Sequence, residues 1–379
     1  MDAGALPPDA PSVRDLDGVF HVYGVRRDDD RLLYFGEPLV PGDELQSMLW
    51  PTFREAGYEV DLQRPSGAAG DVGHVLVAEP VRLGLDGVPW TNLVLFLATV
   101  VSTAYVGAIW YHADLAADPL GIVRGWPFVV SVLGVLGIHE LGHYVASRYY
   151  GVQASLPYFI PVPTIFGTMG AVIRIRGRIP SRTALFDIGI AGPIAGLVAT
   201  LVVTVVGLYL PPVTAPPSVI ESESAVELAI GFPPLLELLA ELTGQPLRYD
   251  DPATSANPVV IAGWLGMFVT FLNLIPVGQL DGGHVTRAIL GSVQRRLGLF
   301  VPPALFGLGV GLYLWFDAAA HAVSVWLLWG VFAVLLAAAG PAHPIDDRSL
   351  DRGRVALGVA VFVVGALCFT PVPIEIVAG

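Results

Sequence analysis

The chain has 379 residues, of which 54% are hydrophobic and only 14% are charged, and its mean hydropathy is +0.65. A soluble domain of this size carries about a quarter charged residues. The composition therefore argues against a soluble globular protein and indicates that lipid solvates much of the chain. The formal net charge of −13, with no lysine present, also disfavours a nucleic-acid-binding protein.

Residues 1–88 are the exception to this apolar composition. Their pattern predicts a small N-terminal α+β soluble domain with a disordered tail over residues 1–12. Apolar and polar residues alternate on both sides of Asp28, Asp29 and Asp30, as in a β-hairpin. We expect strands at 19–25 and 31–35, a helix at 43–56, and further strands at 58–62 and 74–81.

Residues 89–379 contain seven apolar stretches of about the 20 residues that a helix needs to cross a bilayer. The predicted fold is therefore mainly α, a polytopic transmembrane helix bundle of about seven spans that follows the small soluble domain. We expect the spans at 92–111, 126–149, 184–210, 259–277 with an extension to about 290, 299–316, 319–340 and 355–371.

The distribution of arginine orients this bundle. Arginines cluster in the connections at 148–182, 287–296 and 348–354, whereas the connection 211–258 has seven acidic residues and Arg248 as its one basic residue. Basic loops face the cytoplasm. We therefore expect an integral, multi-pass protein of the cell membrane, with the N-terminal domain and the arginine-rich loops on the cytoplasmic side.

The second span contains His139, Glu140 and His143 in a His-Glu-x-x-His pattern. Two histidines four residues apart lie on one helix face, so both imidazoles can reach one metal ion. Glu140 can then take a proton from water activated by that ion. Ionisable side chains are costly inside a span, which makes them functional candidates. The alternative is a pair of core histidines satisfied by neighbouring helices.

A zinc protease site also needs a third protein ligand and an open fourth position. The fourth span supplies Asp281, in a stretch where Pro276 and several glycines interrupt the apolar sequence. This interruption predicts a broken helix, which is tolerated at membrane depth only where it is buried or lines a wet cavity. The alternative for Asp281 is a turn-forming Asp-Gly pair at the end of the span.

The two motifs are expected at similar depths in the membrane. His139 and His143 precede Arg148 by nine and five residues, and Asp281 precedes Arg287 by six. The second and fourth spans run in the same direction. At ~1.5 Å per residue, each group should lie on the order of 10 Å inside its basic boundary. A shared metal ion requires such a match.

A membrane-embedded His-Glu-x-x-His followed two spans later by an Asn-x-x-Pro-x-x-x-Leu-Asp-Gly segment resembles the site-2 protease family of intramembrane zinc metalloproteases. The resemblance covers a three-span catalytic core at about 126–290. It implies that His139, His143 and Asp281 bind one Zn²⁺ per chain, that Glu140 is the catalytic base, and that Asn273 positions the substrate or stabilises the oxyanion. It also implies substrates that are transmembrane helices of other proteins, unwound and hydrolysed within or near the bilayer in regulated proteolysis.

Residues 166–182, Asp187 and residues 191–196 resemble the branch of that family found in chloroplasts, cyanobacteria and archaea. The connection 211–258 is too short for the PDZ domain that many bacterial members carry. The sequence leaves the oligomeric state unknown.

Several alternatives stay open. The chain can be a catalytically inactive homologue that binds transmembrane partners, or a transporter that uses His139, Glu140 and Asp281 as a cation pathway, although neither motif recurs as inverted repeats would require. Residues 160–179 can form a hairpin whose edge pairs with an extended substrate, or a plain connector. Gly192 and Gly196 have the spacing that favours close helix packing, with direct substrate contact as the alternative.

Overall fold

The computed structural model describes residues 7, 10–64, 73–81, 87–162, 164–220 and 227–377. The chain divides into two compact units. One unit comprises Met1–Gly84 with the short pieces Gly151–Gln153 and Arg176–Arg178. The other comprises Leu85–Tyr150, Ala154–Ile175 and Ile179–Gly379.

The first unit is a four-stranded antiparallel sheet with one packed helix. The strand order is β1-β2-β4-β3, and the elements along the chain are η1 (Val13–Leu16), β1 (Phe20–Asp28), β2 (Arg31–Pro38), α1 (Gly42–Glu55), β3 (Tyr58–Gln63) and β4 (His74–Pro80). The predicted order of strands and helix is confirmed. Asp29 turns the β1–β2 hairpin with a φ of 52°, a left-handed conformation that Asp tolerates better than most residues.

The core of this unit lies between α1 and the sheet. Tyr34 on β2 packs edge-on against Phe53 on α1, and both side chains are fully buried. The Tyr34 hydroxyl donates a hydrogen bond of 2.8 Å to the carbonyl of Pro11. Pro11 belongs to the range expected to be a disordered tail, and it is buried in this core. Most of that range lies outside the described residues.

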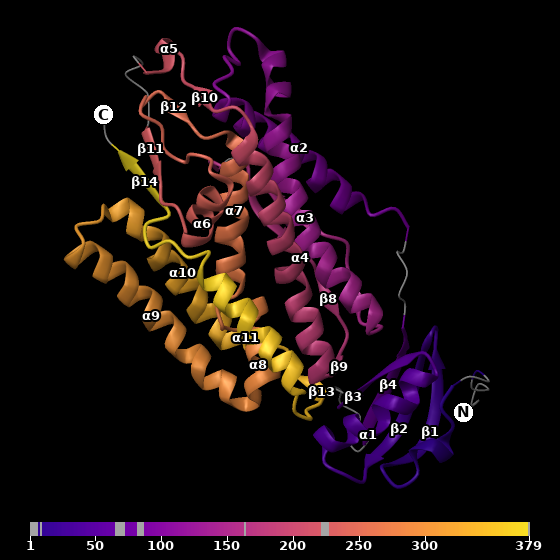
Figure 1. Ribbon diagram of the computed structural model, residues 1–379. Helices are drawn as coiled ribbons and strands as arrows, with labels where there is room; N and C mark the ends of the chain where they lie inside the picture. Colours follow the sequence, from indigo (N-terminus) through magenta and orange to yellow (C-terminus); the bar gives the residue numbers. More distant parts are fainter. Residues whose placement is uncertain are drawn as a thin grey trace. The chain divides into compact units, whose positions relative to one another are not determined.

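The second unit is a bundle of helices (Figure 1). They are α2 (Trp90–Trp110), η2 (Pro119–Gly125), α3 (Trp126–Tyr149), α4 (Arg182–Tyr209), α5 (Pro217–Ile220), α6 (Pro234–Thr243), α7 (Pro258–Asn273), α8 (Asp281–Leu290), η3 (Gly291–Val293), α9 (Gln294–Trp315), α10 (Ala320–Ala339) and α11 (Arg352–Ala366).

Within the described residues, five helical segments are long and apolar enough to cross a membrane: Trp90–Trp110, Pro119–Tyr149, Arg182–Tyr209, Asp281–Trp315 and Ala320–Ala339. This agrees with a mainly helical, multi-pass membrane protein, but the prediction of about seven spans is not confirmed. α7 has 16 residues and α11 has 15. At ~1.5 Å per residue these helices reach about 24 and 22 Å, short of a hydrocarbon core of ~30 Å.

The helix expected at 259–290 is broken, as the sequence predicted. α7 ends at Asn273, and α8 begins at Asp281 after a non-helical stretch. Pro276 has no N–H to donate to a helical hydrogen bond. Gly278 has a φ of 51°, and an ideal Cβ there would lie 2.1 Å from the carbonyl oxygen of Leu336 on α10. Only glycine fits this turn, because both the backbone conformation and the neighbouring helix exclude a side chain.

The centre of the bundle is formed by α4, which packs against both α3 and α7 (Figure 1). Small residues allow the close approach of α4 and α7. An ideal Cβ at Gly263 would lie 2.2 Å from Thr204 Oγ1, and one at Gly266 would lie 2.4 Å from Thr200 Oγ1. Such residues are typical of tightly packed helices in membranes. The three helices α3, α4 and α7 therefore form a closely fitted group.

Short strands connect the helices of this unit. They form five two-stranded pairs: β5 (Gln153–Ala154) with β8 (Ile175–Arg176), β6 (Tyr158–Pro161) with β7 (Thr168–Val172), β9 (Ile179–Ser181) with β13 (Pro344–Asp346), β10 (Val213–Thr214) with β12 (Thr254–Ser255), and β11 (Glu227–Ile230) with β14 (Ile374–Val377). Of the two alternatives for residues 160–179, a hairpin is present as β6 and β7.

Candidate metal centre

Two helices of the bundle bring the predicted metal-binding residues together. His139 and His143 lie one turn apart on the buried face of α3, with exposed fractions of 4% and 5%. Asp281 is the first residue of α8, directly after the non-helical stretch. One donor atom from each of the three residues lies within 4.8 Å of the other two. The chain therefore brings Asp281 together with two histidines that lie far earlier in the sequence.

The distances in this cluster fit a zinc ion. His139 Nε2 lies 3.2 Å from His143 Nε2 and 3.2 Å from Asp281 Oδ2. His143 Nε2 lies 3.2 Å from Asp281 Oδ1. Ligands bonded to tetrahedral zinc at 2.0–2.1 Å are separated from one another by about 3.3 Å. The two nitrogens and the carboxylate would therefore suit three of the four ligand positions of such an ion, with the fourth open to water or substrate.

A hydrogen bond from α3 to α4 orients the His143 ring. His143 Nδ1 lies 2.7 Å from the backbone carbonyl of Ile188, to which it donates. The protonated Nδ1 leaves Nε2 as the atom with a free lone pair, which is the usual arrangement of a metal-binding histidine. Ile188 could not be predicted from the sequence, because any residue type can supply a backbone carbonyl.

Glycines on α4 make room for both imidazoles. An ideal Cβ at Gly192 would lie 2.0 Å from His143 Nε2, and one at Gly196 would lie 2.7 Å from His139 Nδ1. Both distances are far shorter than a van der Waals contact. The spacing of these glycines was interpreted as a helix-packing signal, and the partners that they accommodate are the two histidines themselves.

Glu140 and Asn273 lie beside this cluster. The Glu140 side chain is buried, with 7% exposed, and the backbone of Ile173 donates a hydrogen bond to its carboxylate. Ile173 lies between β7 and β8 and belongs to neither strand. Its N–H therefore donates to Glu140 and not to a neighbouring strand. Asn273, the last residue of α7, has its Nδ2 3.2 Å from His139 Nε2. His139, His143, Asp281 and Asn273 are thus joined by direct contacts, and Glu140 follows His139 in the chain with a buried side chain.

The arrangement has the chemistry of a hydrolytic zinc site. Two neutral imidazoles and one carboxylate are a common ligand set for catalytic zinc. A carboxylate that is not a ligand and an amide donor complete the set of groups that peptide hydrolysis requires. The burial of these polar groups among apolar helices also matches the pattern of functional residues inside a membrane protein.

Comparison of the sequence with known proteins assigns the chain to a family. The family model described as "Peptidase family M50" matches residues 127–305. The chain is 32% identical over 294 residues to "Probable zinc metalloprotease EGY1, chloroplastic" from Arabidopsis thaliana, an alignment that covers 72% of this chain and 51% of that protein. It is 32% identical over 265 residues to "Probable zinc metalloprotease EGY2, chloroplastic" from the same plant, covering 68% and 44%.

A third relative from Arabidopsis thaliana, "Probable zinc metallopeptidase EGY3, chloroplastic", is 25% identical over 376 residues, covering 92% of this chain and 62% of that protein. The chain spans about half the length of the first two relatives. No solved structure matches it. The family model and the relatives agree with the motifs and with the clustered His139, His143 and Asp281, and the chain belongs to peptidase family M50, the site-2 protease family.

Proposed function

We propose that this chain is an intramembrane zinc metalloprotease that hydrolyses peptide bonds within or near transmembrane segments of other proteins. The observation that carries the proposal is the convergence of His139, His143 and Asp281, with mutual donor distances of 3.2 Å, beside the buried Glu140. The relatives are named as probable zinc metalloproteases, which supports the same activity here.

In this proposal His139, His143 and Asp281 hold one Zn²⁺ per chain. When bound, zinc supplies a Lewis acid that acidifies water and polarises a peptide carbonyl. The hydrogen bond from His143 Nδ1 to Ile188 and the close contacts of Gly192 and Gly196 fix the rings before the ion arrives. A fixed ligand set lowers the cost of binding, because little ordering remains to be done.

Glu140 is the proton carrier in the proposed reaction. Its carboxylate takes a proton from the attacking water as the water oxygen bonds to the scissile carbonyl carbon. It then delivers that proton to the leaving nitrogen as the C–N bond breaks, so that a carboxylic acid and an amine are formed. In this proposal Asn273 Nδ2, which lies 3.2 Å from His139 Nε2, donates a hydrogen bond to the carbonyl oxygen as negative charge develops on it.

The substrates that fit such a site are transmembrane helices unwound into an extended form. The β6–β7 hairpin is close to the site, since Ile173 directly follows β7 and contacts Glu140. Among the described residues no third strand pairs with this hairpin, and its edge would offer backbone groups to an extended strand. We place the catalytic core at residues 126–290, which contain α3, α4, α7 and α8.

The finer topology belongs to this proposal as well. We place α7 and α11 as short additional spans, which gives about seven, in a cell membrane. The arginine distribution favours a cytoplasmic position for residues 1–88 and for the mouth of the site. In this proposal residues 89–379 contact the lipid bilayer.

The test compares the wild-type chain with Glu140→Gln, which removes the proton carrier and leaves the ligands in place. Both proteins are purified in detergent, incubated with single-span membrane proteins, and the fragments are identified by mass spectrometry. We expect cleavage to fall by about 10²–10⁴-fold while the zinc content stays at one per chain. Glu237→Gln, on the exposed side of α6, is the control and should cleave normally.

Three other results would each contradict a part of this proposal. Cleavage retained by Glu140→Gln would exclude Glu140 as the base. Zinc binding by the wild type with no cleavage of any substrate in the panel would indicate an inactive homologue. Zinc or proton flux into liposomes that depends on Glu140 would indicate a transporter.

A further inference from the structure

Helix α8, which begins with Asp281, is short, and the backbone is not α-helical on either side of it. It has ten residues. The non-helical stretch that contains Gly278 precedes it, and Gly291, with a φ of 61°, begins η3, which leads into α9. Although the apolar helical segment runs on to Trp315, the backbone departs from α-helical geometry at Gly291, so α8 and α9 are not one continuous α-helix. The position of α8, and with it the position of Asp281, depends on contacts made by its sides and its far end.

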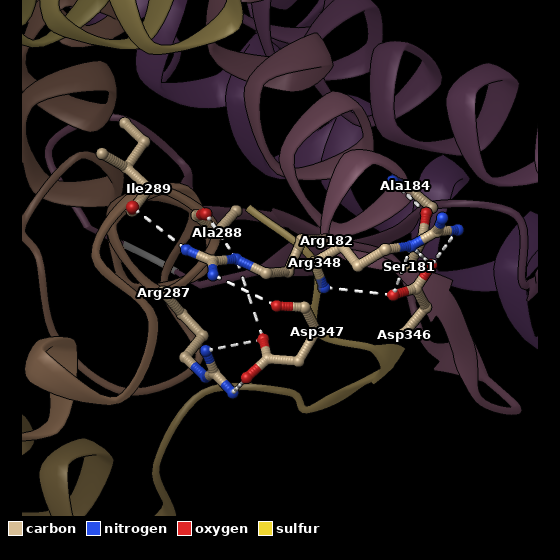
Figure 2. Close-up of polar contacts among 9 residues, drawn as sticks. All are labelled: Ser181, Arg182, Ala184, Arg287, Ala288, Ile289, Asp346, Asp347 and Arg348. Atoms are coloured by element: carbon tan, nitrogen blue, oxygen red, sulfur yellow. Dashed lines mark hydrogen bonds and ion pairs between the residues drawn. The ribbon is translucent and has the colours of Figure 1, made fainter. Parts of the chain in front are cut away.

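Two buried arginines anchor that far end (Figure 2). Arg287 on α8 donates from Nη1 and Nη2 to the two carboxylate oxygens of Asp347, at 3.1 and 3.2 Å. Arg182, the first residue of α4, donates from Nε to the carbonyl of Ala288 at 2.9 Å and from Nη2 to the carbonyl of Ile289 at 3.0 Å. The last carbonyls of a helix lack donors within it, so Arg182 satisfies groups that would otherwise be unpaired.

Asp347 reaches these arginines because two strands set its register. β13 and β9 pair in parallel, with Asp346 opposite Ser181. Asp347 and Arg182 directly follow the ends of these two strands and are therefore brought side by side. Asp347 accepts from Arg287 and also lies 3.7 Å from Arg182 Nε. The linker 340–351, between α10 and α11, thus connects the start of α4 to the end of α8.

The same linker contacts α8 nearer to the metal centre. The backbone N–H of Ala342 donates to His284 Nδ1 at 3.4 Å. His284 lies one turn after Asp281. The linker therefore follows α8 from the first turn, where the ligand is, to the last turn, where Arg287 is.

We propose that the Arg287–Asp347 ion pair is a positioning device for the metal centre: it fixes α8 along its axis and so sets where the Asp281 carboxylate meets the two imidazoles. Arg287 is six residues from Asp281, about 9 Å along the helix. A rigid helix passes a displacement at one end to the other, whereas metal–ligand bonds tolerate deviations of only about 0.2 Å. The inference rests on the proposed function, since it requires that His139, His143 and Asp281 bind a metal.

The burial of the two arginines explains why loss of the Asp347 charge would matter, although Asp347 itself is exposed. The exposed fractions are 8% for Arg287 and 9% for Arg182, and 53% for the Asp347 side chain. Removal of the Asp347 charge leaves buried guanidinium groups without their counter-ion, and such groups move toward water when they can. For Arg287, that movement displaces α8.

The experiment measures zinc affinity of the full chain in detergent, by competition with a chelating dye. Asp347→Asn keeps the size of the side chain and removes its charge. We expect its zinc dissociation constant to rise about tenfold, in the range found for residues that act on a site through another group. Asp346→Asn is the matched control. Its partner Arg348 is 89% exposed, so zinc affinity should change less than about twofold.

A second variant and an absorption spectrum distinguish a displaced ligand from a general loss of stability. Arg287→Lys keeps the charge but loses the two-pronged geometry, and we expect weakened zinc binding from it too. Replacement of zinc by Co²⁺ gives a visible absorption band that reports ligand geometry, and the band should shift in Asp347→Asn and not in Asp346→Asn. A lowered unfolding temperature in Asp347→Asn with wild-type zinc affinity and an unshifted band would overturn the positioning role. Failure of the wild type to bind zinc would instead overturn the proposed function.

Discussion

Gly192 offers the sharpest test of the metal centre, because its replacement by alanine should displace one ligand without removing any. An ideal Cβ at position 192 would lie 2.0 Å from His143 Nε2 and 2.3 and 2.5 Å from its Cδ2 and Cε1. Non-bonded carbon and nitrogen atoms need about 3.5 Å. The imidazole must therefore move by about 1.5 Å, several times the roughly 0.2 Å that a metal–ligand bond tolerates.

The expected loss of zinc affinity can be worked out from the number of ligands. Protein zinc sites bind with about 10–16 kcal/mol over four positions, so one ligand contributes about 3 kcal/mol. Gly192→Ala should thus weaken zinc binding on the order of 100-fold. The substitution itself should favour the helix, because alanine stabilises a helix by about 1 kcal/mol relative to glycine. A loss of zinc affinity would therefore not come from a weakened α4.

The assay is zinc competition on the purified chain, with unfolding temperature and cleavage measured on the same samples. Gly134→Ala is the matched control, since Gly134 is also helical and has no atom within 4 Å of its ideal Cβ. It should keep wild-type zinc affinity. If Gly192→Ala folds and binds zinc as tightly as the wild type does, the imidazole of His143 is not a ligand in the position described.

Three further results are expected. Dialysis against a strong chelator should abolish cleavage and addition of one Zn²⁺ per chain should restore it, whereas cleavage by metal-free protein would exclude zinc as the cofactor. Asn273→Ala should lower kcat by about 10²–10³-fold with little change in zinc affinity, and an unchanged kcat would remove its role at the oxyanion. Gly263→Ala should lower the free energy of unfolding by about 1–3 kcal/mol, because its Cβ would lie 2.2 Å from Thr204 Oγ1. Gly307→Ala, which meets open space, is the control for thermal unfolding, and equal midpoints would contradict the packing argument.

Much of the site could be predicted because its signals are local in the sequence. His139 and His143 are one helical turn apart, so a helix is enough to align them. Pro276 and Gly278 interrupt the apolar run, and they do break the helix just before Asp281. The strands of the first unit were predicted for the same reason, since alternation along a strand depends only on neighbouring residues.

The features that were not predicted depend on distant parts of the chain. The count of about seven spans is not confirmed, because apolar composition does not reveal where a helix ends, and α7 and α11 end after 16 and 15 residues. Arg182 and Arg287 looked like loop arginines that orient the protein, but both are buried. Their partner Asp347 comes from a linker 60 residues beyond Arg287, and no local pattern joins them.

Helix α4 supplies no donor atom to the proposed ion, yet it touches both imidazoles, through the carbonyl of Ile188 and the bare backbone of Gly192 and Gly196. A smaller protein that carried only the two histidines and the aspartate would lack the α4 surface that holds the imidazole rings in position. Designers who wish to reproduce the centre in a smaller scaffold would need to copy the donor-free helix as faithfully as the two that coordinate.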